Sequence, residues 1–464
     1  MSTFALFFGN RGFFPASLQE QARREIPAVL ERLGHEYIML DAEATRYGAV
    51  ETPEEGKIYR RFLEENRGRY DGIILSLPNF GDETGAVAAL KDAGAPIFIQ
   101  AYPDELDKMS PELRRDSFCG KLSVMDVFTQ YGIPFTIYKP HTVSPEGKNF
   151  EEQIEQFSAV CRIVQGMQGL TVGAIGARTT PFKTVRIDEI TLQKYGITVE
   201  TFDLSEVFGR MRALSTKNVE LTEKREILSR YTDWDGVPDA NFDHLARMGV
   251  VFDQIIRENN LDAVAVRCWL EMQQEFGISP CVLLSEMNNR KMIAACEVDV
   301  GSAITMSALS FASNNAATCL DWNNNYGEEE NKCILFHCGP VPASMMTGKG
   351  KIVDHAILKN AVGPGCSYGP NIGRIKPQEV TYGNLLTRDG RLEYYIGEAR
   401  FTDDPIPEDF FGCAGVAQFP DLQETLYTLG RLGHRHHVAC TPGRVAAALD
   451  EALARYVGGC VTWF

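Results

Sequence analysis

The sequence predicts an α/β protein in which two layered α/β domains are followed by a β-rich, barrel-like C-terminal domain. Three observations support this fold class. Short apolar strands alternate with helices over the first third of the chain, a second series of the same kind begins near Thr171, and short strand-like segments with turn signals follow residue 345. The predicted domain boundaries are 1–165, 166–345 and 346–464.

The first predicted domain alternates strands and helices from its start. Nearly continuous apolar strands of this kind indicate a parallel sheet, and ligands gather at the carboxyl ends of such strands. Loops at those ends contain Arg11 and Asn79. The expected strands cover 4–8, 36–40, 72–77, 96–100 and 132–138, and the expected helices cover 19–33, 54–66 and 84–93.

The second and third domains are predicted from the same kinds of pattern. In the second, a β-rich apolar segment begins at Pro280, and a helix follows from Gly301, so that Glu297 lies where a strand gives way to a helix. The earlier strands are expected at 171–175, 198–202 and 263–267, and the earlier helices at 187–195, 217–231 and 240–259. In the third, the Asp389-Gly390 pair indicates a hairpin. Its strands are expected at 352–358, 379–387, 391–399 and 414–419, before a helix at 444–456.

Composition excludes several classes of protein. The chain has 464 residues, 44% hydrophobic and 23% charged, which indicates a globular protein, and its net charge of −16 disfavours a nucleic-acid or membrane-surface binder. No apolar run is long enough to cross a bilayer, and the first nine residues resemble a strand and not a signal peptide, so we expect a cytoplasmic protein. The 12 cysteines form no CxxC pair and are interpreted as reduced thiols.

Two carboxylates and a late histidine form the candidate metal site. Glu297 and Asp321 each follow an apolar or small-residue run, and a carboxylate near a core needs a partner. Each acid alone is also compatible with a capping or solvated loop role. Together they suit a hard cation, Mn²⁺ or Mg²⁺, with Co²⁺ a further option. Of His436 and His437, only one can share the ion because neighbours on a strand face opposite ways, and we favour His437. His337 is a fourth ligand, a contact to a ligand or a core histidine.

This ligand set suits the isomerisation of a sugar. A cation with open coordination positions can hold a neighbouring hydroxyl and carbonyl, while one carboxylate moves a proton between the two carbons through an ene-diol. The other carboxylate handles the oxygen proton. The chemistry requires no redox cofactor. Two other functions stay open at this point: a non-catalytic sugar-binding or sensor protein, and a metal-dependent aldolase or hydrolase.

Several segments resemble the L-fucose isomerase family, which is related to the L-arabinose isomerases. They are residues 268–271, 295–300, 303–306, 320–321 and 436–439, and the resemblance extends over the whole chain. It implies two Rossmann-like domains before a β-rich domain and Mn²⁺-dependent aldose–ketose isomerisation. Glu297 and Asp321 would be the metal-binding proton-transfer pair, His437 the C-terminal ligand, and His337 the additional histidine of the arabinose branch.

The resemblance also implies a homo-oligomer, a trimer or a hexamer, with active sites shared between subunits. Arg11, Asn79 and Lys121 would then contact substrate at the metal of another chain, and Arg178 and Trp269 are further expected substrate contacts. The chain has more cations near these loops than a neutral deoxy sugar requires, Lys183 and Arg186 among them. Each is either a structural ion-pair partner or part of a site for an anionic sugar such as sulfoquinovose.

Overall fold

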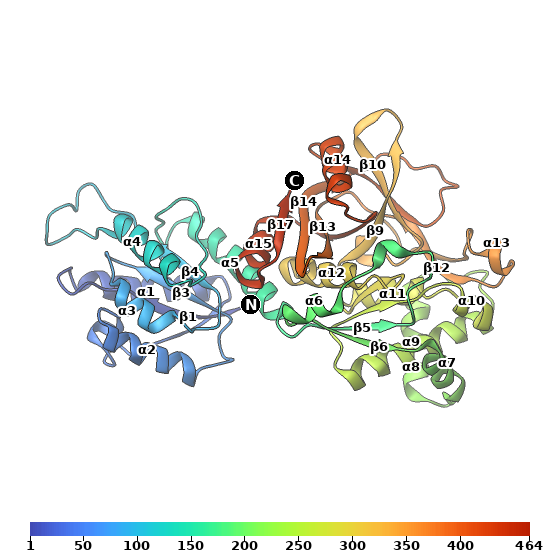
Figure 1. Ribbon diagram of the computed structural model, residues 1–464, viewed down its shortest axis with the longest axis horizontal. Coiled ribbons are helices and arrows are strands. Elements are labelled where there is room, and N and C mark those ends of the chain that lie inside the picture. Colours follow the sequence, from blue (N-terminus) through green and yellow to red (C-terminus); the bar gives the residue numbers. More distant parts are fainter. The chain divides into compact units, whose positions relative to one another are not determined.

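The computed structural model describes residues 1–464, which form two compact units (Figure 1). Unit 1 comprises Met1–Gln165 and Glu451–Tyr456, and unit 2 comprises Gly166–Asp450 and Val457–Phe464. None of the helices has the length and apolar character that crossing a membrane requires. The division into three domains at residues 165 and 345 stays a prediction, whereas the predicted fold class is confirmed by the sheets described below.

Unit 1 is built on a four-stranded parallel sheet with the strand order β2-β1-β3-β4. Its strands are β1 (Thr3–Phe8), β2 (Glu36–Met39), β3 (Gly72–Leu77) and β4 (Ile97–Ala101). All of β3 is buried because helices cover both faces, which explains its continuous apolar sequence. The helices are α1 (Ser17–Arg32), α2 (Pro53–Glu65), α3 (Glu83–Leu90), α4 (Ser117–Gln130) and α5 (Lys148–Met167).

The strand expected at 132–138 is wrong. Only a single bridge forms there, between Thr136 and Phe98 of β4. Pro134 lies in the middle of the segment and has no N–H to donate, so a regular ladder cannot continue through it.

Unit 2 begins with a second four-stranded parallel sheet, whose order β6-β5-β7-β8 repeats that of unit 1. Its strands are β5 (Thr171–Ile175), β6 (Thr198–Phe202), β7 (Ala263–Val266) and β8 (Ile293–Cys296). The helices are α6 (Glu189–Lys194), α7 (Leu204–Ala213), α8 (Val219–Tyr231), α9 (Asp239–Asn259), α10 (Glu271–Phe276), α11 (Cys281–Asn289) and α12 (Val300–Ser313).

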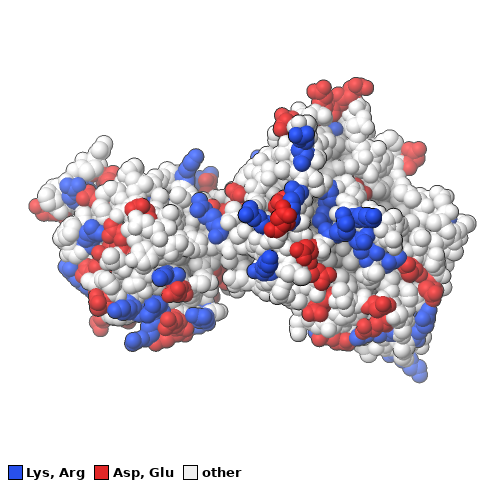
Figure 2. All heavy atoms as spheres, viewed as in Figure 1, with Lys and Arg blue, Asp and Glu red and all other residues white.

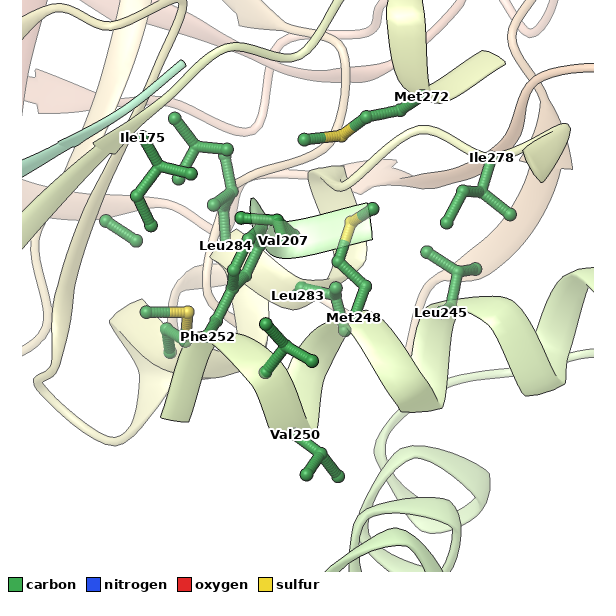
Figure 3. Packing of buried hydrophobic residues seen from close by; sticks show 14 of the residues in the cluster. Ile175, Val207, Leu245, Met248, Val250, Phe252, Met272, Ile278, Leu283 and Leu284 are labelled. Carbon is green, nitrogen blue, oxygen red and sulfur yellow. The ribbon is translucent and has the colours of Figure 1, made fainter. Parts of the chain in front are cut away.

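The expected β-rich segment after Pro280 is also wrong, because that stretch is the helix α11. Its residues 281–288 are all buried, so no polar face reveals the helical period in the sequence. Figure 3 shows the reason: Leu283 and Leu284 of α11 pack into the same core as Val207 of α7 and Met248 and Phe252 of α9.

The remaining strands of unit 2 form a nine-stranded sheet that closes into a barrel. The strand order is β11-β12-β15-β10-β9-β16-β13-β14-β17, and an additional β14–β15 pairing closes the ring from β15 to β14. The ring strands are β9 (Thr318–Tyr326), β10 (Glu329–His337), β13 (Gln378–Arg388), β14 (Arg391–Phe401), β15 (Cys413–Gln418) and β16 (His437–Pro442). The flanking strands are β11 (Lys351–Asp354), β12 (Tyr368–Arg374) and β17 (Cys460–Trp463).

Two further details of this region bear on the sequence predictions. The hairpin at Asp389-Gly390 is confirmed, since β13 and β14 pair in continuous register up to Arg388 and Arg391. The strand expected at 352–358 ends earlier, at Asp354, because the chain turns at His355. The helices are α13 (Lys359–Val362), α14 (Leu422–Leu432) and α15 (Ala446–Asp450), followed by the π-helical turn Glu451–Val457.

Candidate active site

Glu297 lies at the carboxyl end of the second parallel sheet. Strand β8 ends at Cys296, and Glu297 and Val298 have positive φ values of 61° and 58° before α12 begins at Val300. Asp299 caps that helix by accepting the N–H of Ser302 at 3.0 Å. Positive φ is costly for residues other than glycine, and such residues concentrate at functional sites. The tight turn therefore presents the Glu297 carboxylate at the sheet edge where α/β proteins bind ligands.

Strand register brings Asp321 and His437 together. Strand β9 pairs antiparallel with β16, and Asp321 lies directly opposite His437. Side chains directly opposite each other on neighbouring strands are in contact range. Nε2 of His437 is 3.5 Å from Oδ1 of Asp321 and 3.0 Å from Oε2 of Glu297. Three residues that are far apart in the sequence thus converge around one imidazole nitrogen.

The converging atoms are buried and lack hydrogen-bond partners. Oδ1 of Asp321 and Nε2 of His437 both belong to this group, because the contact of His437 with Glu297 is poorly directed for a hydrogen bond. The ligand atoms of Glu297, His337 and His437 lie within 4.8 Å of one another, as do those of Asp321, His436 and His437. Carboxylate oxygens with one or two imidazole nitrogens are suitable ligands for a hard divalent cation. The residues present therefore fit a metal ion.

Asp299 fixes the orientation and tautomer of His437. Its Oδ2 lies 2.7 Å from Nδ1 of His437, and its carboxylate also accepts hydrogen bonds from Arg435 at 2.5 Å and from the Ser302 hydroxyl at 2.6 Å. Burial alone would raise the pKa of Asp299, but Arg435 and His437 hold that pKa well below its usual range. An ionised carboxylate only accepts, so Nδ1 of His437 carries the proton and the Nε2 lone pair faces Glu297 and Asp321.

The charge balance of the cluster favours a cation. Burial alone would raise the pKa of Glu297, but His437 and His337 lower that pKa below its ordinary value. Burial would likewise lower the pKa of His437, yet Cys319, Asp299 and Glu297 raise it well above the ordinary value. Both pKa shifts indicate that the acids around His437 stabilise a positive charge there, whether from a proton or from a metal ion.

His337 faces the same carboxylate with the opposite hydrogen-bonding character. Its Nδ1 accepts the N–H of Cys338 at 2.9 Å, so the neutral ring carries its proton on Nε2. That Nε2 is buried, has no hydrogen-bond partner and lies 4.0 Å from Oε2 of Glu297. The arrangement suits a hydrogen-bond donor better than a metal ligand.

His436 and Trp269 contact the same pair of acids from other directions. Nε2 of His436 is 3.7 Å from Oδ1 of Asp321, but its side chain is 44% exposed, whereas that of His437 is fully buried. The two neighbours thus face different surroundings, as expected on a strand. Trp269, just after β7, donates its indole N–H to Oε1 of Glu297 at 3.2 Å. This bond leaves Oε2 directed at the histidines.

The loop between β5 and α6 covers the cluster, and its aromatic residue was missed by sequence reasoning. The ring of Phe182 lies 5.7 Å from that of His437 and 5.5 Å from that of His436. Arg178 ties the loop together by donating to the carbonyl oxygens of Thr179, Thr180 and Phe182. The sequence signal was the basic loop that follows the strand. Only the fold shows that its one aromatic side chain packs on the histidines.

Three predicted substrate contacts, Arg11, Asn79 and Lys121, belong to unit 1. There, Oδ1 of Asn79 accepts the N–H of Arg11 at 3.2 Å, and the Arg11 guanidinium pairs with Glu83 and lies over the ring of Phe80 at 4.2 Å. Lys121 is buried and donates to the carbonyl oxygen of His141 at 2.7 Å. Their part in a shared active site stays a prediction.

Comparison with known proteins gives the family. Residues 5–168 match the model of the fucose/sulfoquinovose isomerase N-terminal domain, and residues 335–462 match that of the L-fucose isomerase C-terminal domain. The chain belongs to the L-fucose isomerase family. As a member of this family it is an aldose–ketose isomerase of carbohydrate metabolism, which sets aside the binding-protein and aldolase or hydrolase alternatives.

The chain is also similar to several sulfoquinovose isomerases. The chain is similar to the sulfoquinovose isomerase of Priestia megaterium, with 25% identity over 399 residues that cover 84% of this chain and 85% of the relative. Sulfoquinovose isomerases of Alkalicoccus urumqiensis and Clostridium sp. are 26% and 23% identical and cover 60% and 67% of this chain and 61% and 68% of their own. A solved sugar-binding protein, GanP from Geobacillus stearothermophilus, aligns over 67% of this chain and 91% of its own with 14% identity and a TM-score of 0.16, too low to inform the comparison.

Proposed function

We propose that this chain interconverts sulfoquinovose and its 2-ketose, using a divalent cation held by Glu297, Asp321 and His437. The observation that carries the proposal is the convergence of Oδ1 of Asp321 and Oε2 of Glu297 on Nε2 of His437, at 3.5 and 3.0 Å. Lone pairs that face one another in a buried place need a positive charge between them. Mn²⁺ is the proposed ion, and Mg²⁺ or Co²⁺ has suitable ligand preferences as well.

The side chains of the cluster divide the work of the reaction. A bound cation supplies polarisation of the two adjacent sugar oxygens, which acidifies the C–H bond at C2. One of the carboxylates of Glu297 and Asp321 takes the C2 proton and returns it at C1, and the other manages the hydroxyl proton, so the carbonyl moves through an ene-diol. The Trp269 indole N–H holds Glu297 in place, and the Phe182 ring covers the buried His437.

The preference for an anionic sugar is supported by the loop that covers the cluster. Lys183 and Arg186 are exposed on the same loop as Phe182, and neither side chain has an ion-pair partner among those found in the structure. Figure 2 shows Lys and Arg side chains gathered over the segment between β5 and α6, in a surface where both signs are otherwise mixed. Sulfoquinovose carries a sulfonate, which exposed cations on the loop that covers the cluster can attract. The relatives named for sulfoquinovose support the same choice.

The reaction is tested by following sulfoquinovose in D₂O by proton NMR. We expect ketose formation and exchange of the C2 proton, loss of both after treatment with EDTA, and recovery with Mn²⁺. Glu297→Gln is expected to lower the rate by at least a thousandfold while folding is kept, because an amide cannot accept the proton. Full turnover by the EDTA-treated protein, or by this variant, would reject the proposed site.

The choice of sugar needs a separate comparison. In the double variant Lys183→Ala with Arg186→Ala, we expect kcat/KM for sulfoquinovose to fall about tenfold or more, whereas kcat/KM for a neutral aldose such as glucose or L-fucose changes little. Lys217→Ala is the matched control, since Lys217 is an exposed cation on the distant loop between α7 and α8. Equal losses on charged and neutral sugars would favour a neutral substrate of the L-fucose type.

A further inference from the structure

A cavity is lined by Glu297 but not by Asp321. It has a volume of about 230 Å³, and Glu297 and His337 contribute to its wall together with His355. The rest of the wall is thiol, aliphatic, indole and hydroxyl groups, and no Lys or Arg lines it. The four thiols are those of Cys268, Cys281, Cys296 and Cys338, and burial is a cause of the raised pKa of each, so they are uncharged.

His355 is fixed in one tautomer by the turn that follows it. Its Nδ1 accepts the backbone N–H of Ile357 at 3.3 Å and that of Leu358 at 3.2 Å. The ring is 4% exposed and packs against Phe411, with 5.0 Å between ring centroids. Burial, with a smaller contribution from His337, lowers the pKa of His355 to about 4. At neutral pH the imidazole is therefore uncharged, and its only proton is on Nε2.

His337 has the same hydrogen-bonding pattern, and its Nε2 lies 4.0 Å from Oε2 of Glu297. Its Nδ1 accepts the Cys338 N–H, and its buried Nε2 has no partner. Two imidazoles thus line one cavity, each with Nδ1 occupied by backbone N–H donors. A bare cation offers no acceptor oxygen to two N–H donors, and the Glu297 carboxylate in a wall without Lys or Arg disfavours an anion. The ligand class that fits this wall is an uncharged molecule with acceptor oxygens, such as the hydroxyl groups of a sugar.

We propose that His355, together with His337, binds hydroxyl oxygens of the sugar in this cavity as a fixed hydrogen-bond donor, and that the charged end of the substrate lies outside the cavity. This inference rests on the proposed function and extends it to His355, which neither takes up a proton nor holds the metal. It also gives the turn at residues 355–358 a role, since the backbone N–H groups of Ile357 and Leu358 in this turn set the tautomer of His355.

Two substitutions separate binding of substrate from support of the turn. In His355→Asn, the amide oxygen can accept at the place of Nδ1 but nothing reaches the place of Nε2. In His355→Gln, the amide N–H₂ reaches the place of Nε2 and the turn loses its acceptor. We expect the Asn variant to keep its thermal midpoint and to raise KM for sulfoquinovose about three- to tenfold, the effect of one lost neutral hydrogen bond. The Gln variant should keep KM within about twofold and melt earlier.

The reverse pattern, with KM unchanged in His355→Asn and raised in His355→Gln, would show a structural role only and overturn the inference. Monodeoxy analogues of the sugar give an independent check: the gap in kcat/KM between wild type and the Asn variant should close for the analogue that lacks the contacted hydroxyl. If no analogue closes the gap, the inference is likewise wrong. His244→Asn, which alters a histidine on α9 that does not line the cavity, is the control and should keep KM.

The wild-type protein separates failure of the inference from failure of the function. If wild type converts none of sulfoquinovose, glucose and L-fucose with Mn²⁺ present, the proposed function fails and the inference fails with it. If wild type is active on any of them and His355→Asn leaves KM for that sugar unchanged, the inference alone is rejected.

Discussion

The two parallel sheets have the same strand order, yet the polar groups near their carboxyl ends are satisfied in different ways. In unit 1, Asn79 donates to Oδ1 of Asn10 at 2.7 Å, and Asn10 donates to Glu51 at 2.7 Å, so these side chains satisfy one another, although Oε1 of the neighbouring Gln19 has no partner. In unit 2, buried Nε2 of His437 and Oδ1 of Asp321 face Glu297 without partners. A shared fold therefore does not decide function, and unsatisfied buried atoms are the better indicator of a site.

The chemical reason for the contrast is the choice of side chains. An amide both donates and accepts, so several amides can satisfy one another. Ionised carboxylates only accept, so Glu297 and Asp321 cannot close a network with His437 unless a proton or a metal ion supplies positive charge there. Surrounding groups hold them in place nonetheless, Asp299 at His437 and Trp269 at Glu297. The cost of the unsatisfied cluster is repaid when a cation binds.

The largest expected effect comes from placing an amide in the unit 2 cluster, as in the amide network of unit 1. In Asp321→Asn, the new amide N–H₂ can donate to Nε2 of His437, which lies 3.5 Å from Oδ1 in the wild type. We expect turnover to fall by at least a thousandfold and the thermal midpoint in EDTA to rise by a few degrees, as acceptor crowding is relieved. Rates and scanning calorimetry measure both. A lower midpoint in EDTA would contradict the comparison.

A second variant tests the hydrogen bond between Asp299 and Nδ1 of His437. In Asp299→Asn, the amide can donate to Nδ1 of His437, which moves the ring proton to Nε2 and blocks the lone pair. We expect the affinity for Mn²⁺, measured by titration calorimetry, to fall about 10- to 100-fold. Ser302→Ala removes only one of the hydrogen bonds to Asp299 and is the milder control, with a smaller loss. Unchanged affinity in Asp299→Asn would argue against this role of Asp299.

Sequence patterns alone predicted part of this contrast. The apolar strands and the acidic or amide loops that follow them predicted both parallel sheets and placed Glu297 at a strand–helix junction. This was possible because strand and helix periods are local properties of the sequence. The pairing of Asp321 with His437 was not predictable in this way, since it depends on the long-range register of β9 and β16. The tautomers of His337 and His355 depend on which backbone N–H groups the turns direct at Nδ1, and no residue pattern encodes that. Helix α11 was missed because burial on all sides removes its polar face.

The hydrogen-bond network of Asn79, Asn10 and Glu51 in unit 1 should contribute to stability. In Asn79→Ala, the amide donor to Asn10 is lost, as is the oxygen that accepts the N–H groups of Arg11 and Gly81. Buried groups left without partners cost about 1–3 kcal/mol of the free energy of unfolding. Hydrogen exchange of the β3 amides would report the loss within unit 1, with exposed Asn323→Ala in unit 2 as control. Protection of β3 equal to wild type would mean that the network contributes nothing to stability.

The smallest expected effect concerns Lys121, a buried cation in unit 1 that donates a hydrogen bond to the carbonyl oxygen of His141. Burial lowers the pKa of Lys121 from 10.5 to about 8. The unfolded chain therefore binds more protons than the folded one between about pH 8 and 10.5, and this residue makes stability rise with pH across that window. The rise is at most about 1.4 kcal/mol per pH unit. Denaturant unfolding of wild type and Lys121→Met at pH 8 and 9 should show it as a difference between the two, because other groups titrate in both proteins alike. Lys217→Met, at an exposed position, should behave as wild type. If Lys121→Met shows the same pH dependence as wild type, the ammonium is not desolvated as its burial indicates, and water or an acid reaches it.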